Sequence, residues 1–176
     1  MYLHHPKIAL KTKMSTAIIR PIKKSDNQEI AKVIREVLIE MGVPKVGTAY
    51  ADAALDKIFE TYDVPRAQYF VAELDGKLVG SAGIAQLQNY DGPVCELQKM
   101  YFLNIVRGKG LGAQMMKKCL DFARENDYSQ VYIETMPNME SAQKLYVKTG
   151  FHYIDGPMGD TGHSSCPIHM LMDLKA

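Results

Sequence analysis

The sequence predicts a single α/β domain, of the α+β type, with a mixed, mostly antiparallel sheet and helices on both faces. Two observations favour this fold class. Segments with strand-like alternation are interspersed along the chain with segments of helical periodicity, which gives about six to seven strands. The chain has 176 residues, of which 47% are hydrophobic and 23% charged, as in an ordinary one-domain globular protein.

Composition also excludes several classes of function. A net charge of +1 gives no bias towards nucleic acid or an anionic membrane surface, and no apolar run reaches 18 residues. The three cysteines are widely spaced and do not form a disulfide framework. We therefore expect a cytoplasmic protein with neither a nucleic-acid nor a membrane partner. Residues 1–15 lack a signal-peptide core and read as a poorly ordered extension, and the domain spans 16–176.

The first elements of the domain are a strand and two helices. "AIIRPI" (17–22) alternates and suits a short strand. "SDNQEIAKVIREVLIEMG" (25–42) has apolar residues at helical spacing, with Ser25 or Asp26 as the N-cap and Gly42 just past the end. "AYADAALDKIFETY" (49–62) predicts a second helix against the same face.

A three-stranded meander follows. "QYFVAEL" (68–74) and "LVGSAGIAQL" (78–87) flank an Asp-Gly turn and predict a hairpin. "VCELQKMYFL" (94–103) adds the third strand. Gly80 and Gly83 are costly inside a strand and indicate that another group approaches closely there.

The remainder alternates between helix and strand. A helix is predicted from Leu111 to about Glu125, then a strand over 129–136 and a helix over 137–150 with Asn138 as N-cap and Gly150 as the C′ glycine. Residues 151–154 and 168–174 would form a closing strand pair on either side of a loop.

The glycine-rich stretch "RGKGLG" (107–112) opens a helix, and such a loop is typical of phosphate binding. No serine or threonine follows for magnesium, which excludes a mononucleotide P-loop. "GKGLGA" fits a dinucleotide fingerprint, with Glu134 as the ribose-binding acid. However, the preceding strand is partly polar, and only 64 residues remain after Gly112.

Two motifs together resemble the GNAT family of acetyltransferases. "RGKGLG" matches that family's pyrophosphate loop, [QR]-x-x-G-x-[GA], and "AQKLYVKTGF" (142–151) matches its A-x-x-L-Y-x-x-x-G-F pattern. The resemblance covers roughly residues 16 to 174. It implies a sheet with a splayed central strand pair and acetyl-CoA as cosubstrate. The implied coenzyme contacts are the strand residues Met100, Tyr101 and Phe102, the loop residues Arg107, Gly108, Lys109, Gly110, Leu111 and Gly112, and the helix residues Asn138 and Tyr146.

Acetyl transfer to an amine needs a base, an oxyanion donor and an acid. Tyr146 resembles the family's general acid, since its pKa of ~10 exceeds the ~8.5 of a thiol. Glu96 lies where one branch of the family carries a catalytic glutamate and is the candidate base, acting through water. The free N–H near Met100 would stabilise the oxyanion. Strand parity places Glu96, Gln98, Met100 and Phe102 on one face.

The loop "GHSSCPIH" (162–169) offers His163 as an acceptor-site candidate. His163, Cys166 and His169 recur every third residue, but strand alternation should separate the last two, so no metal is expected. No cysteine reads as an acetyl carrier: Cys119 lies on the buried helix stripe, Cys95 in a strand, and Cys166 has only His163 beside it.

The sequence therefore predicts an N-acetyltransferase that moves acetyl from acetyl-CoA to a small-molecule or peptide amine by direct attack, with a homodimer as a family-level possibility. The alternative is a non-catalytic acyl-CoA sensor or interaction module on the same fold. The acceptor stays open.

Overall fold

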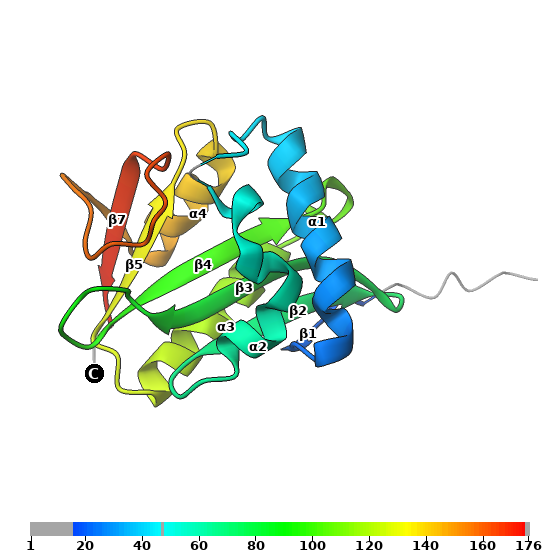
Figure 1. The fold of residues 1–176 in the computed structure, drawn as a ribbon, viewed down its shortest axis with the longest axis horizontal. Coiled ribbons are helices and arrows are strands. Elements are labelled where there is room, and N and C mark those ends of the chain that lie inside the picture. The colour runs from blue at the N-terminus through cyan, green and yellow to red at the C-terminus, as the bar shows by residue number, and fades with distance from the viewer. Residues whose placement is uncertain (1–15, 47, 175–176) are drawn as a thin grey trace, which may run out of the picture.

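The computed structural model describes residues 16–46 and 48–174, so the predicted extension at 1–15 lies outside the described residues. Its centre is one seven-stranded sheet in the order β1-β2-β3-β4-β5-β7-β6 (Figure 1). The strands are β1 (Ile18–Pro21), β2 (Gln68–Leu74), β3 (Lys77–Gln86), β4 (Val94–Phe102), β5 (Gln130–Thr135), β6 (His152–Ile154) and β7 (Ile168–Asp173). Only the β4–β5 pair is parallel, so the predicted fold class is confirmed.

In the described part of the chain, four α-helices cover the two faces of the sheet. They are α1 (Asn27–Glu40), α2 (Ile58–Tyr62), α3 (Leu111–Glu125) and α4 (Glu140–Thr149). In Figure 1, α1 and α2 cross in front of the sheet and α3 passes behind it. One apolar core lies under α1 and α2, and a second packs against α3 and α4. A central strand therefore presents each of its faces to a different core.

Local chemistry explains several element boundaries. Asp75 and Gly76 both have positive φ, 50° and 79°, as the tight turn between β2 and β3 requires. Gly42 and Gly150 also have positive φ where α1 and α4 end, as predicted. Asp26 stands at the start of α1, but its carboxylate accepts hydrogen bonds from Arg20 and the Lys23 amide and does not cap the helix.

The predicted helix over 49–62 is wrong in its first two turns. The structure has two 3-10 turns, Ala49–Ala51 and Ala53–Lys57, before the short α2. Asp52 separates them because its backbone is extended (ψ 114°) and its carboxylate accepts from the Ala54 amide at 2.8 Å. An aspartate whose side chain can accept from the backbone two residues ahead competes with helical hydrogen bonding. Here Asp52 ends one 3-10 turn and caps the next.

The prediction that another group approaches Gly80 and Gly83 of β3 closely is confirmed. A Cβ on Gly80 would lie 2.1 Å from Phe102 Cδ1, and one on Gly83 would lie 2.6 Å from the Tyr62 ring. The approaching groups are thus rings of this chain, one from each face of the sheet.

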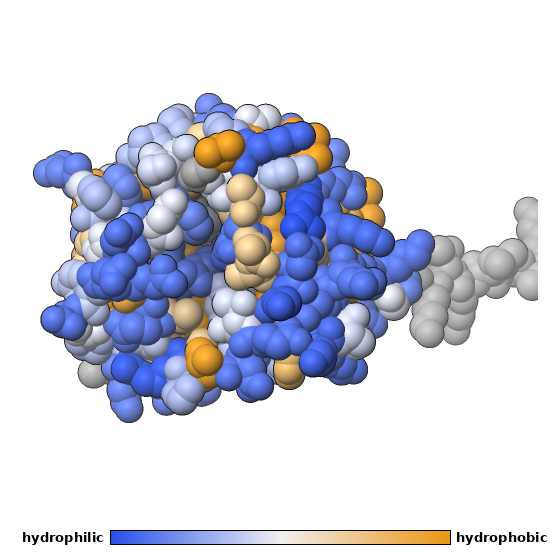
Figure 2. Space-filling view, viewed as in Figure 1, coloured by the Kyte–Doolittle hydropathy of each residue, from blue (hydrophilic) through white to orange (hydrophobic). Residues whose placement is uncertain are grey.

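The face that carries α1 and α2 is mostly hydrophilic, with apolar residues in small separate groups (Figure 2). None of the helices within 16–46 and 48–174 is long and apolar enough to cross a membrane.

Candidate active site

The central parallel strands diverge after a short paired stretch. β4 pairs with β5 only at Val94, Cys95 and Glu96, whereas β4 itself continues to Phe102 and β5 to Thr135. Beyond Glu96, the β4 edge that faces β5 has no strand partner among the residues that the structure describes. This is the splayed strand pair that the resemblance implied.

The glycine loop lies next to this divergence. Gly108 and Gly110 have φ of 72° and 78°, a backbone region that a residue with a side chain enters at a cost, and α3 begins directly after them. The first-turn amides of a helix have no acceptor within the helix, and they carry the positive end of its dipole. The loop therefore has the backbone geometry of an anion site.

A cavity of about 610 Å³ runs from this loop between β4 and α4. Its wall is mainly apolar and includes most of the residues predicted to bind the coenzyme: Met100, Tyr101, Phe102, Arg107, Gly108, Gly112, Asn138 and Tyr146. Lys109, Gly110 and Leu111 belong to the same loop without lining the cavity. We call this space the coenzyme cleft, after the ligand that the resemblance implies.

Arg107 and Asn138 both tie the cleft to α1. Arg107 makes a two-pronged ion pair with Glu40, 2.8 and 2.9 Å, and its Nε donates to the Phe102 carbonyl at 2.8 Å. Asn138 was predicted to cap α4, but the helix begins at Glu140 without a side-chain cap. The Asn138 amide instead donates to the Met41 carbonyl at 2.7 Å, so it bridges two elements that flank the cleft.

Tyr146 lies on α4 and lines the coenzyme cleft, with its ring 6.0 Å from that of Phe151. The side chain is buried, and burial raises the pKa of its hydroxyl above the usual value. Among the described residues this hydroxyl has no hydrogen-bond partner. Every polar side-chain atom there that is fully enclosed does have a partner, so the Tyr146 hydroxyl is not fully enclosed. The hydroxyl therefore reaches open space in the cleft as a proton donor without a fixed acceptor.

Glu96 occupies the centre of the sheet and is only 2% exposed. Burial, then the nearby charge of Glu134, raises its pKa from 4.5 to about 7, against the opposing effects of Gln98 and Lys99. Its Oε2 accepts from Gln98 Nε2 at 2.5 Å. Its Oε1 has no partner among the described residues and so faces the cavity beside it. A carboxylate with this pKa is a base suited to neutral pH.

The prediction that Met100 and Phe102 lie on the same face of β4 as Glu96 and Gln98 is wrong. Ser81 pairs with Tyr101 and Gly83 with Gln98, so Lys99 and Met100 lie opposite the single residue Ala82, and Lys99 has φ of 51°. This β-bulge reverses the alternation. Met100 and Phe102 consequently face the α3 and α4 core, away from Glu96, while Tyr101 faces the α1 and α2 core.

The bulge also brings Lys99 to the Glu96 side. Its side chain is 7% exposed, and its ammonium lies 2.9 Å from the Asp52 carboxylate. Burial alone would raise the pKa of Asp52, but Lys99 outweighs it and the pKa is lowered. Neither residue was predicted as part of the site, because the sequence gives no sign of the bulge that places Lys99 there.

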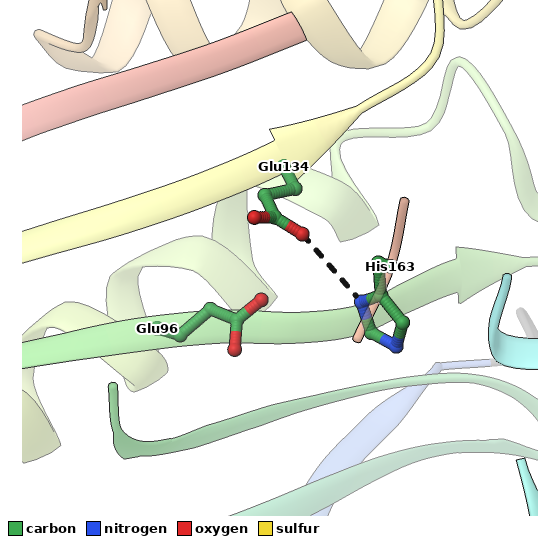
Figure 3. A group of neighbouring side chains, drawn as sticks. All are labelled: Glu96, Glu134 and His163. Atoms are coloured by element: carbon green, nitrogen blue, oxygen red, sulfur yellow. Dashed lines mark ion pairs between the residues drawn. The ribbon is translucent and has the colours of Figure 1, made fainter. Parts of the chain in front are cut away.

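Glu134, on β5, faces Glu96 across the divergence, and His163 reaches both from the loop before β7 (Figure 3). One ligand atom from each of the three lies within 4.8 Å of the others. Glu134 accepts from the hydroxyls of Tyr132 (2.8 Å) and Thr161 (2.6 Å), and its Oε2 lies 3.7 Å from His163 Nδ1. Sequence reasoning noted Glu134 only as a ribose-binding acid.

His163 was predicted as an acceptor-site residue, and it does line the small cavity that contains Glu96. Its pKa is lowered by burial and then by Lys99, against the pull of Glu134 and Asp52, so the ring is neutral at pH 7. The Glu96, Glu134 and His163 atoms could also ligate a divalent cation, which the adjacent Lys99 charge opposes. The absence of a metal stays a prediction.

The cysteines show no activation. Burial is the main cause that raises the pKa of Cys95 to about 12 and of Cys166 to about 11, and it raises that of Cys119 as well. Thiols with raised pKa values are poor nucleophiles at neutral pH.

Comparison with known proteins identifies the family. A sequence model described as "Acetyltransferase (GNAT) family" matches residues 34–151. The chain belongs to the GNAT acetyltransferase family. It is 40% identical over 158 residues to the uncharacterized N-acetyltransferase YjgM of Escherichia coli K12, which covers 89% of this chain and 95% of that one. It is 34% identical over 128 residues to human N-acetylaspartate synthetase, covering 70% of this chain but 40% of that protein.

Solved GNAT structures share the fold. An acetyltransferase of Staphylococcus aureus Mu50 superposes with a TM-score of 0.81 at 22% identity, covering 91% of this chain and all of that one (100%). A phosphinothricin acetyltransferase of Sinorhizobium meliloti, solved in complex with acetyl-CoA, has a TM-score of 0.70 at 22% identity, covering 90% and 89%. The order of elements around the diverging strands is thus that of a GNAT acetyltransferase.

Proposed function

We propose that this protein transfers the acetyl group of acetyl-CoA to a primary amine, by direct attack of the amine in a ternary complex. One observation carries the proposal. The coenzyme cleft, which contains Tyr146, and the small cavity that contains Glu96 share the side chains of Tyr101 and Met139 as a common wall. A proton donor and a base therefore border two adjoining spaces where β4 and β5 diverge.

The cleft suits coenzyme A in three respects. The amides from Gly108 to Gly112 offer donors and dipole charge to a pyrophosphate, whereas the Arg107 amide already donates to the Asn104 carbonyl at 3.1 Å. The unpaired edge of Met100 to Phe102 offers backbone groups to the amides of a pantetheine arm, as a further strand would. The mainly apolar wall suits the alkyl parts of that arm. The S. meliloti relative, solved with acetyl-CoA, supports the same ligand.

The chemistry divides between the two spaces. Glu96 takes a proton from the acceptor ammonium, directly or through water, since an alkylammonium with a pKa of ~10.4 is almost wholly protonated at pH 7. The nitrogen then attacks the thioester carbon, a C–N bond forms, and the N–H near Met100 stabilises the oxyanion. The C–S bond breaks, Tyr146 protonates the thiolate, and the second proton lost by the nitrogen restores the Tyr146 hydroxyl. The products are an N-substituted acetamide, the free thiol and one proton.

The decisive test follows free thiol release from acetyl-CoA with a panel of amines, together with mass detection of the acetylated product. The panel includes aspartate because of the relatives named N-acetylaspartate synthetase. Amine-dependent thiol release is expected. Thermal stabilisation by acetyl-CoA without release for any amine would instead favour the acyl-CoA sensor. A cytoplasmic location and a homodimer remain predictions, the second testable by sedimentation.

A further inference from the structure

Three cavities adjoin one another from the coenzyme cleft to the surface. The small cavity at Glu96, about 40 Å³ and here called the inner cavity, shares Tyr101 and Met139 with the cleft. A more open one of about 300 Å³, the outer cavity, lies under the loop before β7 and shares Glu134, His163 and Cys166 with the inner cavity. Glu134 and His163 thus border both the outer cavity and the inner cavity that contains Glu96.

Acidic groups dominate this path. Glu96, Glu134 and Asp160 line it, and Asp52 lies behind the inner cavity. The bases near it are Lys99, His163 and His169, and the pKa of His163 is lowered by burial and then by Lys99. Four acidic side chains and one lysine therefore line this path or lie directly behind it.

The one lysine on this path is not available to an anionic substrate. Lys99 is nearly buried, and its ammonium is held at 2.9 Å by Asp52. Within 16–46 and 48–174, Glu134 in contrast accepts only from the hydroxyls of Tyr132 and Thr161, with the His163 ring at 3.7 Å. A carboxylate on the acceptor would meet uncompensated negative charge, whereas an ammonium would find it complementary.

The enclosure favours a narrow acceptor. The segment after α1 and the loop before β7 both border the inner cavity, and Ser165 Oγ on the loop donates to the Val46 carbonyl at 3.3 Å. An unbranched alkyl chain suits a cavity of about 40 Å³ better than a bulky group does.

From these charges and this geometry, and resting on the proposed function, we propose that the acceptor is a linear diamine or polyamine. One amino group reaches Glu96 in the inner cavity. The second stays an ammonium in the outer cavity, beside Asp160 and within the field of Glu134.

The test uses three acceptors of one chain length: 1,5-diaminopentane, pentylamine and 5-aminopentanoate. They differ only in a terminal ammonium, methyl or carboxylate group. With acetyl-CoA saturating, kcat/KM is expected to fall in that order, by about tenfold at each step, as a charge contact in a partly buried site implies. Equal values, or a faster reaction of 5-aminopentanoate than of pentylamine, would overturn the proposal. Binding of acetyl-CoA without acetylation of any amine would overturn the proposed function itself.

Asp160→Asn examines the outer cavity directly. Asp160 Oδ1 accepts from the Gly162 amide at 3.3 Å, and an asparagine oxygen keeps that bond while removing the charge. The ratio of kcat/KM for diaminopentane to that for pentylamine should fall several-fold. Asp155→Asn is the matched control, because Asp155 is on the same loop, is exposed and lines none of the three cavities. A ratio that is unchanged in Asp160→Asn, or that falls equally in the control, would count against the proposal.

Discussion

Gln98 donates a hydrogen bond of 2.5 Å from Nε2 to Oε2 of the buried Glu96. The orientation of the Gln98 amide is fixed in turn, because its Oε1 accepts from the Tyr62 hydroxyl. One oxygen of the carboxylate is thereby held, and the other is left to the inner cavity. A base held in this way needs no rearrangement before it accepts a proton.

Replacement of Glu96 by glutamine should lower kcat/KM at pH 7 by about 10²- to 10⁴-fold, the usual contribution of a general base. The pH profile discriminates further. In the wild type, kcat/KM should rise to a plateau above about pH 7, the pKa of Glu96. In the variant it should keep rising towards the amine pKa near ~10, since only free amine reacts. Identical profiles would remove Glu96 from the mechanism.

The same substitution should alter the pH dependence of stability. Folding raises the pKa of Glu96 from 4.5 to about 7, so the folded state binds more protons between these values. The stability that this provides is complete below pH 4.5 and is lost as pH rises through 7, by roughly 3 kcal/mol in total. Urea unfolding at pH 5 and 8 should therefore show a smaller loss in Glu96→Gln than in the wild type. Glu36→Gln, on the exposed face of α1, serves as control and should retain the full loss.

Tyr146→Phe should lower kcat by about 10²-fold, with little change in the KM for acetyl-CoA or in the melting temperature. The hydroxyl has no partner among the described residues, so its removal breaks no hydrogen bond of the fold. Tyr153→Phe is the matched control, since that exposed tyrosine donates to Gln143 at 3.0 Å outside the cleft. Acid catalysis by Tyr146 would be refuted by a kcat equal to that of the control.

Gly80→Ala should destabilise the fold by about 1–3 kcal/mol and raise the KM for acetyl-CoA. The new methyl would lie 2.1 Å from Phe102 Cδ1 and 2.8 Å from the Tyr101 carbonyl, and Phe102 lines the coenzyme cleft. Gly156→Ala is the control, since a Cβ there meets nothing within 4 Å. Chemical unfolding and initial rates at varied acetyl-CoA would measure both effects, and a neutral Gly80→Ala would show that the Phe102 ring moves freely.

Most of the fold could be predicted because its signals are local. Alternation gave β2 and the Asp75–Gly76 turn, and helical periodicity gave α3 within its observed bounds. The second helix was mispredicted because the Asp52 carboxylate accepts a hydrogen bond from the Ala54 amide, which interrupts the helix. Asn138 was misassigned because its partner, the Met41 carbonyl, is 97 residues away.

The candidate site was less predictable because it depends on pairing across the sheet. Glu134 comes close to Glu96 only through the parallel alignment of Glu96 with Tyr132, which no local pattern encodes. Lys99 adopts φ of 51°, which is uncommon for a residue other than glycine, and composition gives no warning of it. Cross-strand register therefore had to come from the structure.

The bulge at Lys99 changes which residues of β4 face each side of the sheet. Before it, even-numbered residues face α1 and α2; after it, odd-numbered ones do. If the same residues formed a regular strand without the bulge, simple alternation would exchange Tyr101 with Met100 and Phe102 between the faces. An aromatic wall common to both substrate spaces would be lost without any change in the residues that perform the chemistry.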